Sequence, residues 1–479
     1  MALIDLVIFF VYMVVMLGVG YYFMKSNSGQ DDYYVGGRNI GPWHIGLSVV
    51  ATDVGGGFSV GLGGLGFVMG LSGSWMLFTG LLGAWLAAVY LIPKVKSNPA
   101  FASFYTFPQI FKYLYNNQVA IVAGVICFIG YLGFTSSQLL AGAKLASGTF
   151  PDLDLNIALI IMGAIAVVYT VLGGLKAVIY TDTIQWIILL LGFIFIGLPI
   201  SYYHVCGWEG IRSTLPDEFF SLTNLRWQDF VNWGITIMPI WFVGMTLYQR
   251  IFASRDEASA KKAWFIAGFF EWPVMAFMGV SLGLLARVAY DQELIGVGIN
   301  DFDPEMGLPI LLSTVLPAGI MGLMMSAYFS AVLSTADSCL MAASGNLTTD
   351  LFKKYFDRQT DKKNMRLSQL FTLLIGVVAL FIAWQMTNVL TLMIYSYAFM
   401  VSGLLVPLLA GLFWSSTNAK AAMASMIGGG VTTVLLSIGG WALPFNLDPN
   451  LFGVSMSLAV FLLVSRYKKQ KKRNYIITK

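Results

Sequence analysis

The chain has 479 residues, of which 57% are hydrophobic and only 11% are charged, whereas roughly 25% of the residues in an average soluble domain are charged. With a mean hydropathy of +0.75 and a net charge of +4, this composition excludes an ordinary soluble globular protein and is typical of a membrane protein. The three cysteines are scattered and the two histidines, His44 and His204, lie far apart, so neither a disulfide framework nor a zinc site is predicted.

Apolar runs long enough to cross the roughly 30 Å hydrocarbon core of a bilayer recur along the whole chain. The first run, 2–24, has spanning length and lacks the cleavage site of a signal peptide, so we interpret it as a transmembrane helix. We therefore expect an all-α integral membrane protein with about thirteen spans, at 2–24, 43–66, 68–93, 120–148, 156–174, 178–203, 229–251, 264–288, 309–344, 367–386, 389–413, 418–440 and 450–466.

Positive charge is distributed unevenly between the two sides of these spans. If the N-terminus lies outside, every Lys and Arg falls in an inside segment except Lys144, Arg212, Arg226 and Arg287. The positive-inside rule therefore predicts a multi-pass protein of the plasma (inner) membrane with its N-terminus outside and its C-terminus in the cytoplasm. The basic tail 467–479 would then lie near anionic lipid, which we favour over nucleic-acid binding.

The second span contains a carboxylate and a run of glycines where a continuous helix would be expected. Asp53 is followed by Gly55, Gly56 and Gly57, and this run predicts an interrupted helix. Irregular backbone at membrane depth is tolerated where it lines a cavity, and its free carbonyls can bind a cation. In the alternative interpretation, Asp53 only caps a half-helix and the glycines only allow close helix packing.

A second polar patch lies in the predicted span 309–344. Within nine residues this span carries four hydroxyl side chains and one carboxylate, which are Ser330, Ser334, Thr335, Asp337 and Ser338. Hard oxygen ligands of this kind suit a small hard cation, whereas a transition metal would favour His and Cys. The alternative is that the hydroxyls bond back to carbonyls one turn earlier, as is common in membrane helices.

Two more carboxylates lie at membrane depth. An intramembrane acid predicts a functional site by default. Asp182, however, lies near the cytoplasmic start of its span and could meet water there, and Glu271 could pair with a buried donor. These alternatives stay open from the sequence.

Four segments in the expected order resemble the sodium/solute symporter family, whose members share the LeuT-type 5+5 inverted-repeat fold with broken core helices. They are DDYYVGGRNIGPWHIGLSVVATDVGGG (31–57), YTVLGGLKAVIYTDTIQ (169–185), SAVLSTADS (330–338) and YSYAFMVSGLLVPLLAGLFW (395–414). The resemblance implies a single transporter domain, 1–479, composed of an extra helix at 2–24, repeats at 43–203 and 229–413, two further helices at 418–466 and the tail 467–479.

The resemblance also implies which residues bind ions. Family members hold sodium between carbonyls at the break of the first core helix and groups on the eighth, which places the ion here between Ala51, Val54, Ala331, Ser334 and Thr335. Some members hold a second sodium ion further toward the cytoplasm, where Asp182 and Ser338 fit. Asp337 stands where those members have a hydroxyl, so this group could bind a second sodium ion or a proton.

The function implied is sodium-coupled import of a small polar solute by alternating access. We favour an amino acid or related nitrogenous metabolite, and the candidate substrate-binding residues are Asp53, Gly57, Phe58, Trp241 and Tyr248, although the aromatic ones could be ordinary packing. A sodium/sugar or sodium/monocarboxylate symporter of the same fold is the alternative, and a sodium-conducting channel or a transporter-like sensor is the alternative from another class.

A primary pump is not predicted, because the chain has no GxxxxGK[ST] nucleotide motif. A membrane enzyme is not predicted either, because no cluster of His, Cys or Ser with a base is present and the two histidines lie far apart. We expect no cofactor and no metal other than Na+, which serves as the coupling ion. The expected partners are the solute, Na+ and the lipid bilayer, without nucleic acid, and the functional unit is expected to be a monomer.

Overall fold

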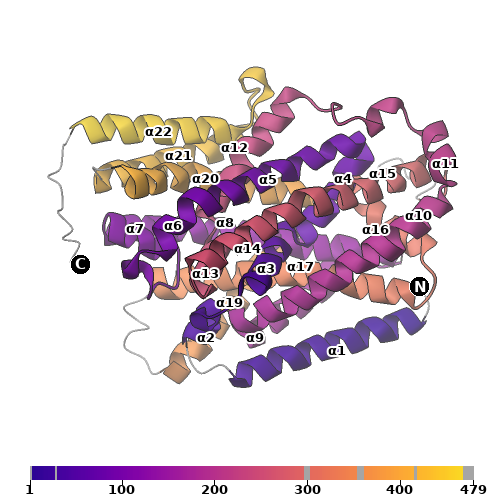
Figure 1. Cartoon of the computed structure of the whole chain (residues 1–479), viewed down its shortest axis with the longest axis horizontal. Helices are drawn as coiled ribbons and strands as arrows, with labels where there is room; N and C mark the ends of the chain where they lie inside the picture. Colours follow the sequence, from indigo (N-terminus) through magenta and orange to yellow (C-terminus); the bar gives the residue numbers. More distant parts are fainter. Residues whose placement is uncertain are drawn as a thin grey trace.

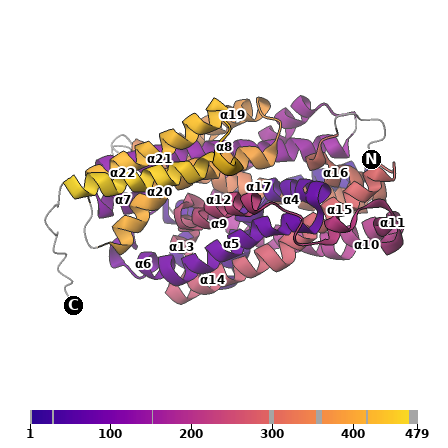
Figure 2. The ribbon, with the colours of Figure 1, turned by 90° about the horizontal axis from the view of Figure 1, so that it is seen from above.

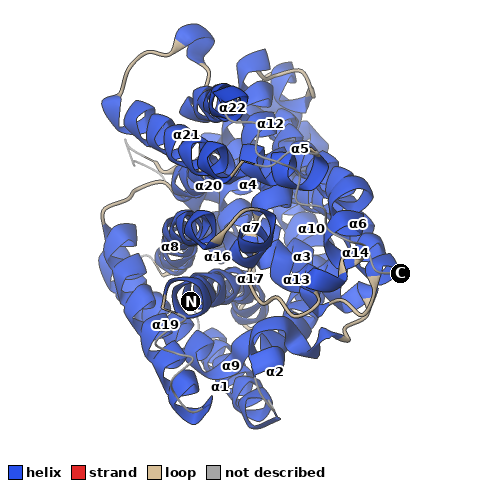
Figure 3. Cartoon of the chain, turned by 90° about the vertical axis from the view of Figure 1, so that its left-hand side faces the viewer, coloured by secondary structure: helices blue, strands red, loops and turns tan. Residues whose placement is uncertain are grey.

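The computed structural model is a bundle of helices that run mostly along its long axis (Figure 1). It describes residues 3–26, 30–150, 152–295, 302–352, 361–414 and 418–467. Within these ranges the only extended pairing is an isolated bridge between Ile40 and Ser254, so the predicted all-α class is confirmed. The end-on view shows neighbouring helices packed as a cluster, with the connections at their ends (Figure 3).

The helices have the following bounds. The first half of the chain forms α1 (Leu3–Ser26), α2 (Gln30–Val35), α3 (Pro42–Val54), α4 (Gly56–Met69), α5 (Trp75–Leu86), α6 (Ile92–Lys96), α7 (Pro108–Leu114), α8 (Asn117–Thr149), α9 (Leu155–Gly192), α10 (Leu198–His204) and α11 (Gly207–Thr214). The second half forms α12 (Trp227–Val243), α13 (Met245–Ala253), α14 (Glu257–Phe269), α15 (Phe277–Asp291), α16 (Gly307–Val315), α17 (Ile320–Gly345), α19 (Asp361–Trp384), α20 (Val389–Phe413), α21 (Ala419–Gly439) and α22 (Pro449–Tyr467).

The predicted count of thirteen spans is not confirmed. By length and composition, nine helices of the described ranges could cross a membrane, or ten if α12 and α13, which meet at a bend of 41°, form one span. The predicted spans 156–174 and 178–203 begin in one uninterrupted helix, α9, since no proline separates them. The predicted span 309–344 is divided into α16 and α17, because Pro317 and Gly319, at φ +86°, interrupt it.

Helix α17 forms the centre of the bundle. Seen from above, it lies among the other helices (Figure 2). It contacts α1, α3, α4, α8, α9 and α19, and 89% of its most apolar 18-residue stretch is buried. Helix α1 holds it from one side, where Asp5 Oδ1 accepts bonds from the backbone N–H groups of Gly319 (2.7 Å) and Gly322 (2.8 Å) at the start of α17. These N–H groups have no partner within the helix, so α1 caps α17 from outside.

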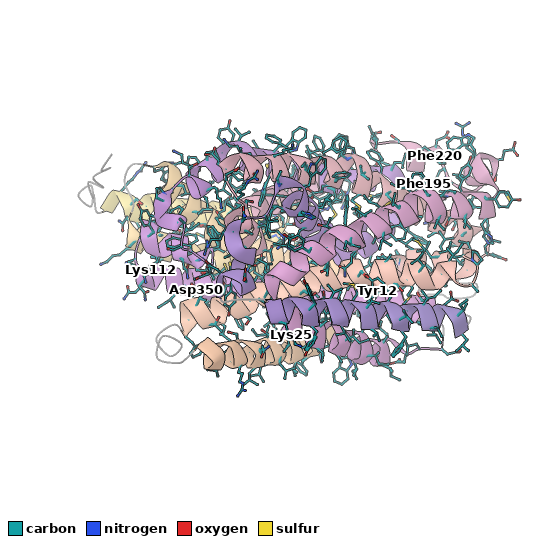
Figure 4. The ribbon with its side chains drawn as sticks, turned by 60° about the horizontal axis from the view of Figure 1, so that its bottom comes forward. Tyr12, Lys25, Lys112, Phe195, Phe220 and Asp350 are labelled. Atoms are coloured by element: carbon teal, nitrogen blue, oxygen red, sulfur yellow. The ribbon has the colours of Figure 1, made fainter. Side chains whose placement is uncertain are left out.

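Labelled side chains mark the two ends of the bundle and its middle. Lys112 and Asp350 lie toward one end, whereas Phe220 lies toward the other, and Tyr12 lies between them on α1, where its hydroxyl accepts a bond from Ser330 of α17 (Figure 4). The start of α1 and the end of α22 also lie at opposite ends of the long axis (Figure 1).

Candidate functional site

The predicted interruption of the second span is confirmed, and it lies directly against α17. Helix α3 ends at Val54 and α4 begins at Gly56, with Gly55 as the turn between them. A Cβ at Gly55 would overlap the hydroxyl oxygen of Thr335, and a Cβ at Gly56 would lie 2.7 Å from the Cα of Val332. Only glycine therefore allows the broken backbone to approach α17 this closely.

Three of the five predicted sodium ligands meet at this contact. The Thr335 hydroxyl lies 3.1 Å from the carbonyl oxygen of Ala51 and 3.2 Å from that of Ala331. Ser334 is buried on the same turn of α17 beside Asp182. The side chain of Val54 lies outside the described residues, and its predicted ligand is a backbone carbonyl. The contact thus gathers neutral carbonyl and hydroxyl oxygens, which suit a small hard cation.

Arg250 of α13 contacts two of the three residues that were predicted to bind a second ion, Asp182 and Ser338. Its guanidinium lies 3.3 Å from Asp182 Oδ2 and donates to the Ser338 hydroxyl at 2.9 Å, and both partners are fully buried. It also donates to Ser48 (3.0 Å) and Thr52 (2.5 Å) of α3. A second cation at Asp182 and Ser338 would have to share both groups with Arg250.

Asp337 has a hydrogen-bond partner that is not part of the Arg250 network. Its Oδ1 accepts a hydrogen bond from the Thr170 hydroxyl of α9, and Thr170 also donates to the carbonyl of Ala166 at 2.8 Å. Asp337 and Ser338 are therefore adjacent in sequence but bond to different partners.

Asp53 lies just before the break and contacts two other parts of the bundle. Its Oδ1 accepts a bond from the Tyr397 hydroxyl of α20 at 3.2 Å. Its carboxyl group also lies within hydrogen-bonding reach of Glu271, which belongs to the π-helical segment Phe270–Ala276 between α14 and α15. Asp53 does not cap the start of α4, where the N-cap position is Gly55 and no side-chain hydrogen bond is present, so the capping interpretation has no support here.

The remaining substrate candidates lie on α12 and α13, on either side of the bend. Trp241 is fully buried and packs against Trp264, with ring centroids 6.4 Å apart. Tyr248 stacks on Phe107 at 4.3 Å, and its hydroxyl donates to the carbonyl of Phe242. The contacts that the structure describes for Asp53 are with Tyr397 and Glu271, and not with Trp241 or Tyr248. Gly57 and Phe58, the other two candidates, belong to α4, and their side-chain surroundings lie outside what the structure describes.

Two site residues were missed from the sequence. Arg250 was counted only as a cytoplasmic charge, although a buried Asp182 without a cation nearby is a signal that one must come from elsewhere. Tyr397 lies within a segment used for the resemblance, YSYAFMVSG, but one tyrosine in an apolar span carries no signal for a partner 344 residues away.

The chain is similar to known proteins over most of its length. A family model described as the sodium:solute symporter family matches residues 33–429. The high-affinity proline transporter PutP of Bacillus subtilis is 30% identical over 441 residues, covering 89% of this chain and 90% of its own. The osmoregulated proline transporter OpuE of the same organism is 27% identical over 473 residues, covering 96% of this chain and 94% of its own.

A solved structure shares the fold over 98% of the chain. It is described as a substrate-bound outward-open state of a Na+-coupled sialic acid symporter, and it superposes with a TM-score of 0.79 at 21% identity, covering 98% of this chain and 100% of its own. At this identity the likeness shows the fold alone.

Proposed function

This chain belongs to the sodium:solute symporter family, and we propose that it imports proline or a closely related amino acid together with sodium. It is a sodium-coupled symporter and not an enzyme. The names of its relatives, PutP and OpuE, support an amino acid as the solute. The same names favour an amino acid over a sugar or a monocarboxylate as the transported solute.

The single observation that carries the proposed ion site is the contact between the broken helix α3–α4 and α17. Ala51 lies in the proposed repeat 43–203, and Ala331, Ser334 and Thr335 lie in the proposed repeat 229–413. In this site Thr335 would turn its hydroxyl oxygen from the Ala51 carbonyl, now 3.1 Å away, toward sodium held by both groups. Sodium binding would then fix the position of one repeat relative to the other, which is what coupling requires.

The driving force is adequate for concentrative uptake. Inward sodium movement yields about 1.4 kcal/mol per tenfold gradient and about 2.3 kcal/mol per 100 mV. One sodium ion per cycle therefore supports accumulation of a neutral solute by roughly several hundredfold.

Arg250 has a separate role in this proposal. Because its guanidinium bonds to α3, α9 and α17 at once, it joins the half of the site formed by the first repeat to the half formed by the second. We place this network on the cytoplasmic side of the ion site. The protein would lie in the plasma membrane as a monomer, with its N-terminus outside.

A solute panel in proteoliposomes tests this function. Labelled proline, other amino acids, a hexose and pyruvate are offered with an inward sodium gradient, an equal potassium gradient, or none. We expect saturable uptake of proline or a related amino acid that requires sodium. Sodium flux without any solute uptake would contradict the symporter and indicate a channel.

A further inference from the structure

Glu271 is a buried carboxylate that the proposed function does not use. Its side chain is fully buried in the π-helical segment Phe270–Ala276, which also contains Pro273. Segments of this type are frequent at functional sites. The facing helix α5 provides space for it, since a Cβ at Gly80 would overlap Glu271 Oε1 and lie 2.6 Å from its Cδ.

The Glu271 carboxyl group and the Asp53 carboxyl group face each other. They lie within hydrogen-bonding reach, yet neither is a hydrogen-bond donor when ionised. Among the described residues, Asp53 Oδ2 and both oxygens of Glu271 have no donor. A buried carboxylate oxygen without a donor is costly, and a cation between the two carboxyl groups would remove that cost.

No lysine or arginine compensates this pair. The buried cations of the described chain are Lys144 and Arg250. Lys144 pairs with Asp303 (2.6 Å) and Glu305 (2.5 Å), and Arg250 pairs with Asp182. The negative charge left without a cation is therefore at Asp53 and Glu271, whereas Asp182 already has one.

We propose that Asp53 and Glu271 together bind a second sodium ion, beside the ion held between Ala51 and Thr335. This inference rests on the proposed sodium coupling, but it moves the second ion from Asp182, Asp337 and Ser338 to a different pair of acids. Hard carboxylate oxygens suit sodium, and the two facing carboxyl groups would supply them from two different segments of the bundle.

The test counts sodium ions on the purified full-length protein in detergent, without solute, by equilibrium binding of radioactive sodium. We expect two ions per chain for the wild type, one for Glu271→Gln, and two for the matched control Asp337→Asn. Gly80→Ala keeps both acids but displaces Glu271, so it should also bind one ion, while Gly234→Ala, where the new Cβ has no atom within 4 Å, should bind two.

One ion per chain in the wild type, or two in both Glu271→Gln and Gly80→Ala, would overturn the inference. Loss of the second ion in Asp337→Asn instead of Glu271→Gln would return it to the group around Asp182. Because the assay contains no solute, these outcomes are independent of whether proline is transported, which the solute panel decides.

Discussion

At the scale of single residues, Thr335 is the group on which the proposed ion site depends most. Its hydroxyl touches carbonyls from both sides of the contact, whereas the Ser330 hydroxyl, on the same helix, bonds to Ser326 and Tyr12. The two hydroxyls are therefore chemically alike but differently placed, which makes them a matched pair for mutation.

Thr335→Ala should raise the sodium concentration for half-maximal uptake by roughly ten- to a hundredfold, since a hydrogen-bonding oxygen on a charged group contributes about 1.5–3 kcal/mol. Ser334→Ala should act in the same direction. The solute concentration for half-maximal uptake at saturating sodium should change less, and Thr335→Ser should restore most of the sodium affinity. Ser330→Ala serves as the control. An unchanged sodium dependence in both Thr335→Ala and Ser334→Ala would remove the proposed ion site.

Asp53→Asn keeps the size and hydrogen-bonding oxygen of the side chain but removes its charge. We expect sodium-driven uptake to collapse while folded protein still reaches the membrane, and Asp53→Glu to restore part of it. Tyr397→Phe removes only the hydroxyl that bonds to Asp53, so its effect should be modest, at about 0.5–1.5 kcal/mol. Near-normal uptake by Asp53→Asn would show that the charge has no part in transport.

At the scale of helices, the interruption between α3 and α4 matters because it brings backbone against backbone. Any residue larger than glycine at position 56 would place its Cβ in the space that Val332 occupies. A continuous helix with side chains at 55 and 56 could not approach α17 closely enough for Ala51 and Thr335 to meet.

Gly56→Ala should therefore separate the two helices, raise the sodium requirement and lower the thermal unfolding midpoint, because overpacking costs about 1–3 kcal/mol. Gly234→Ala on α12, with no atom within 4 Å of the added Cβ, should leave both quantities near those of the wild type. Sodium-dependent uptake and thermal unfolding of the purified protein measure the two effects. A Gly56→Ala variant that behaves like Gly234→Ala would mean that the close approach is not required.

At the scale of the whole molecule, two buried ionic groups connect distant parts of the chain. Lys144 of α8 reaches Glu305, whose carboxylate accepts bonds from the N–H groups of Val389 and Leu390 at the start of α20. Arg250 of α13 reaches Asp182 of α9. Breaking either group leaves a buried charge without its partner.

Arg250→Ala should lower the unfolding free energy by about 3–5 kcal/mol, because Asp182 would remain buried without its cation. The double variant with Asp182→Asn should recover much of this loss. Arg255→Ala breaks an exposed pair with Asp256 and should leave stability near that of the wild type. Unfolding of the purified protein measures all three, and equal stability of Arg250→Ala and Arg255→Ala would contradict the structural role of the buried pair.

The sequence predicts the class of fold, the break after Asp53 and the patch on α17, because each depends on composition or on local residue types. It does not predict that α9 runs without a break from one expected span into the next, or that the expected span 309–344 is divided near Pro317. Apolar runs indicate burial in lipid, but they do not indicate where a helix ends. Contacts such as Arg250 with Asp182 and Asp53 with Glu271 and Tyr397 depend on how distant helices pack. No local pattern encodes them.

The most direct test of the account is uphill uptake by the wild-type protein in proteoliposomes. With an inward sodium gradient and no other energy source, labelled proline or a related amino acid should accumulate above its external concentration, and a sodium ionophore should abolish this accumulation. The Thr335→Ala variant should accumulate the labelled solute only when the external sodium concentration is raised. Uptake that merely equilibrates, or that is equal with potassium in place of sodium, would contradict sodium coupling through this site.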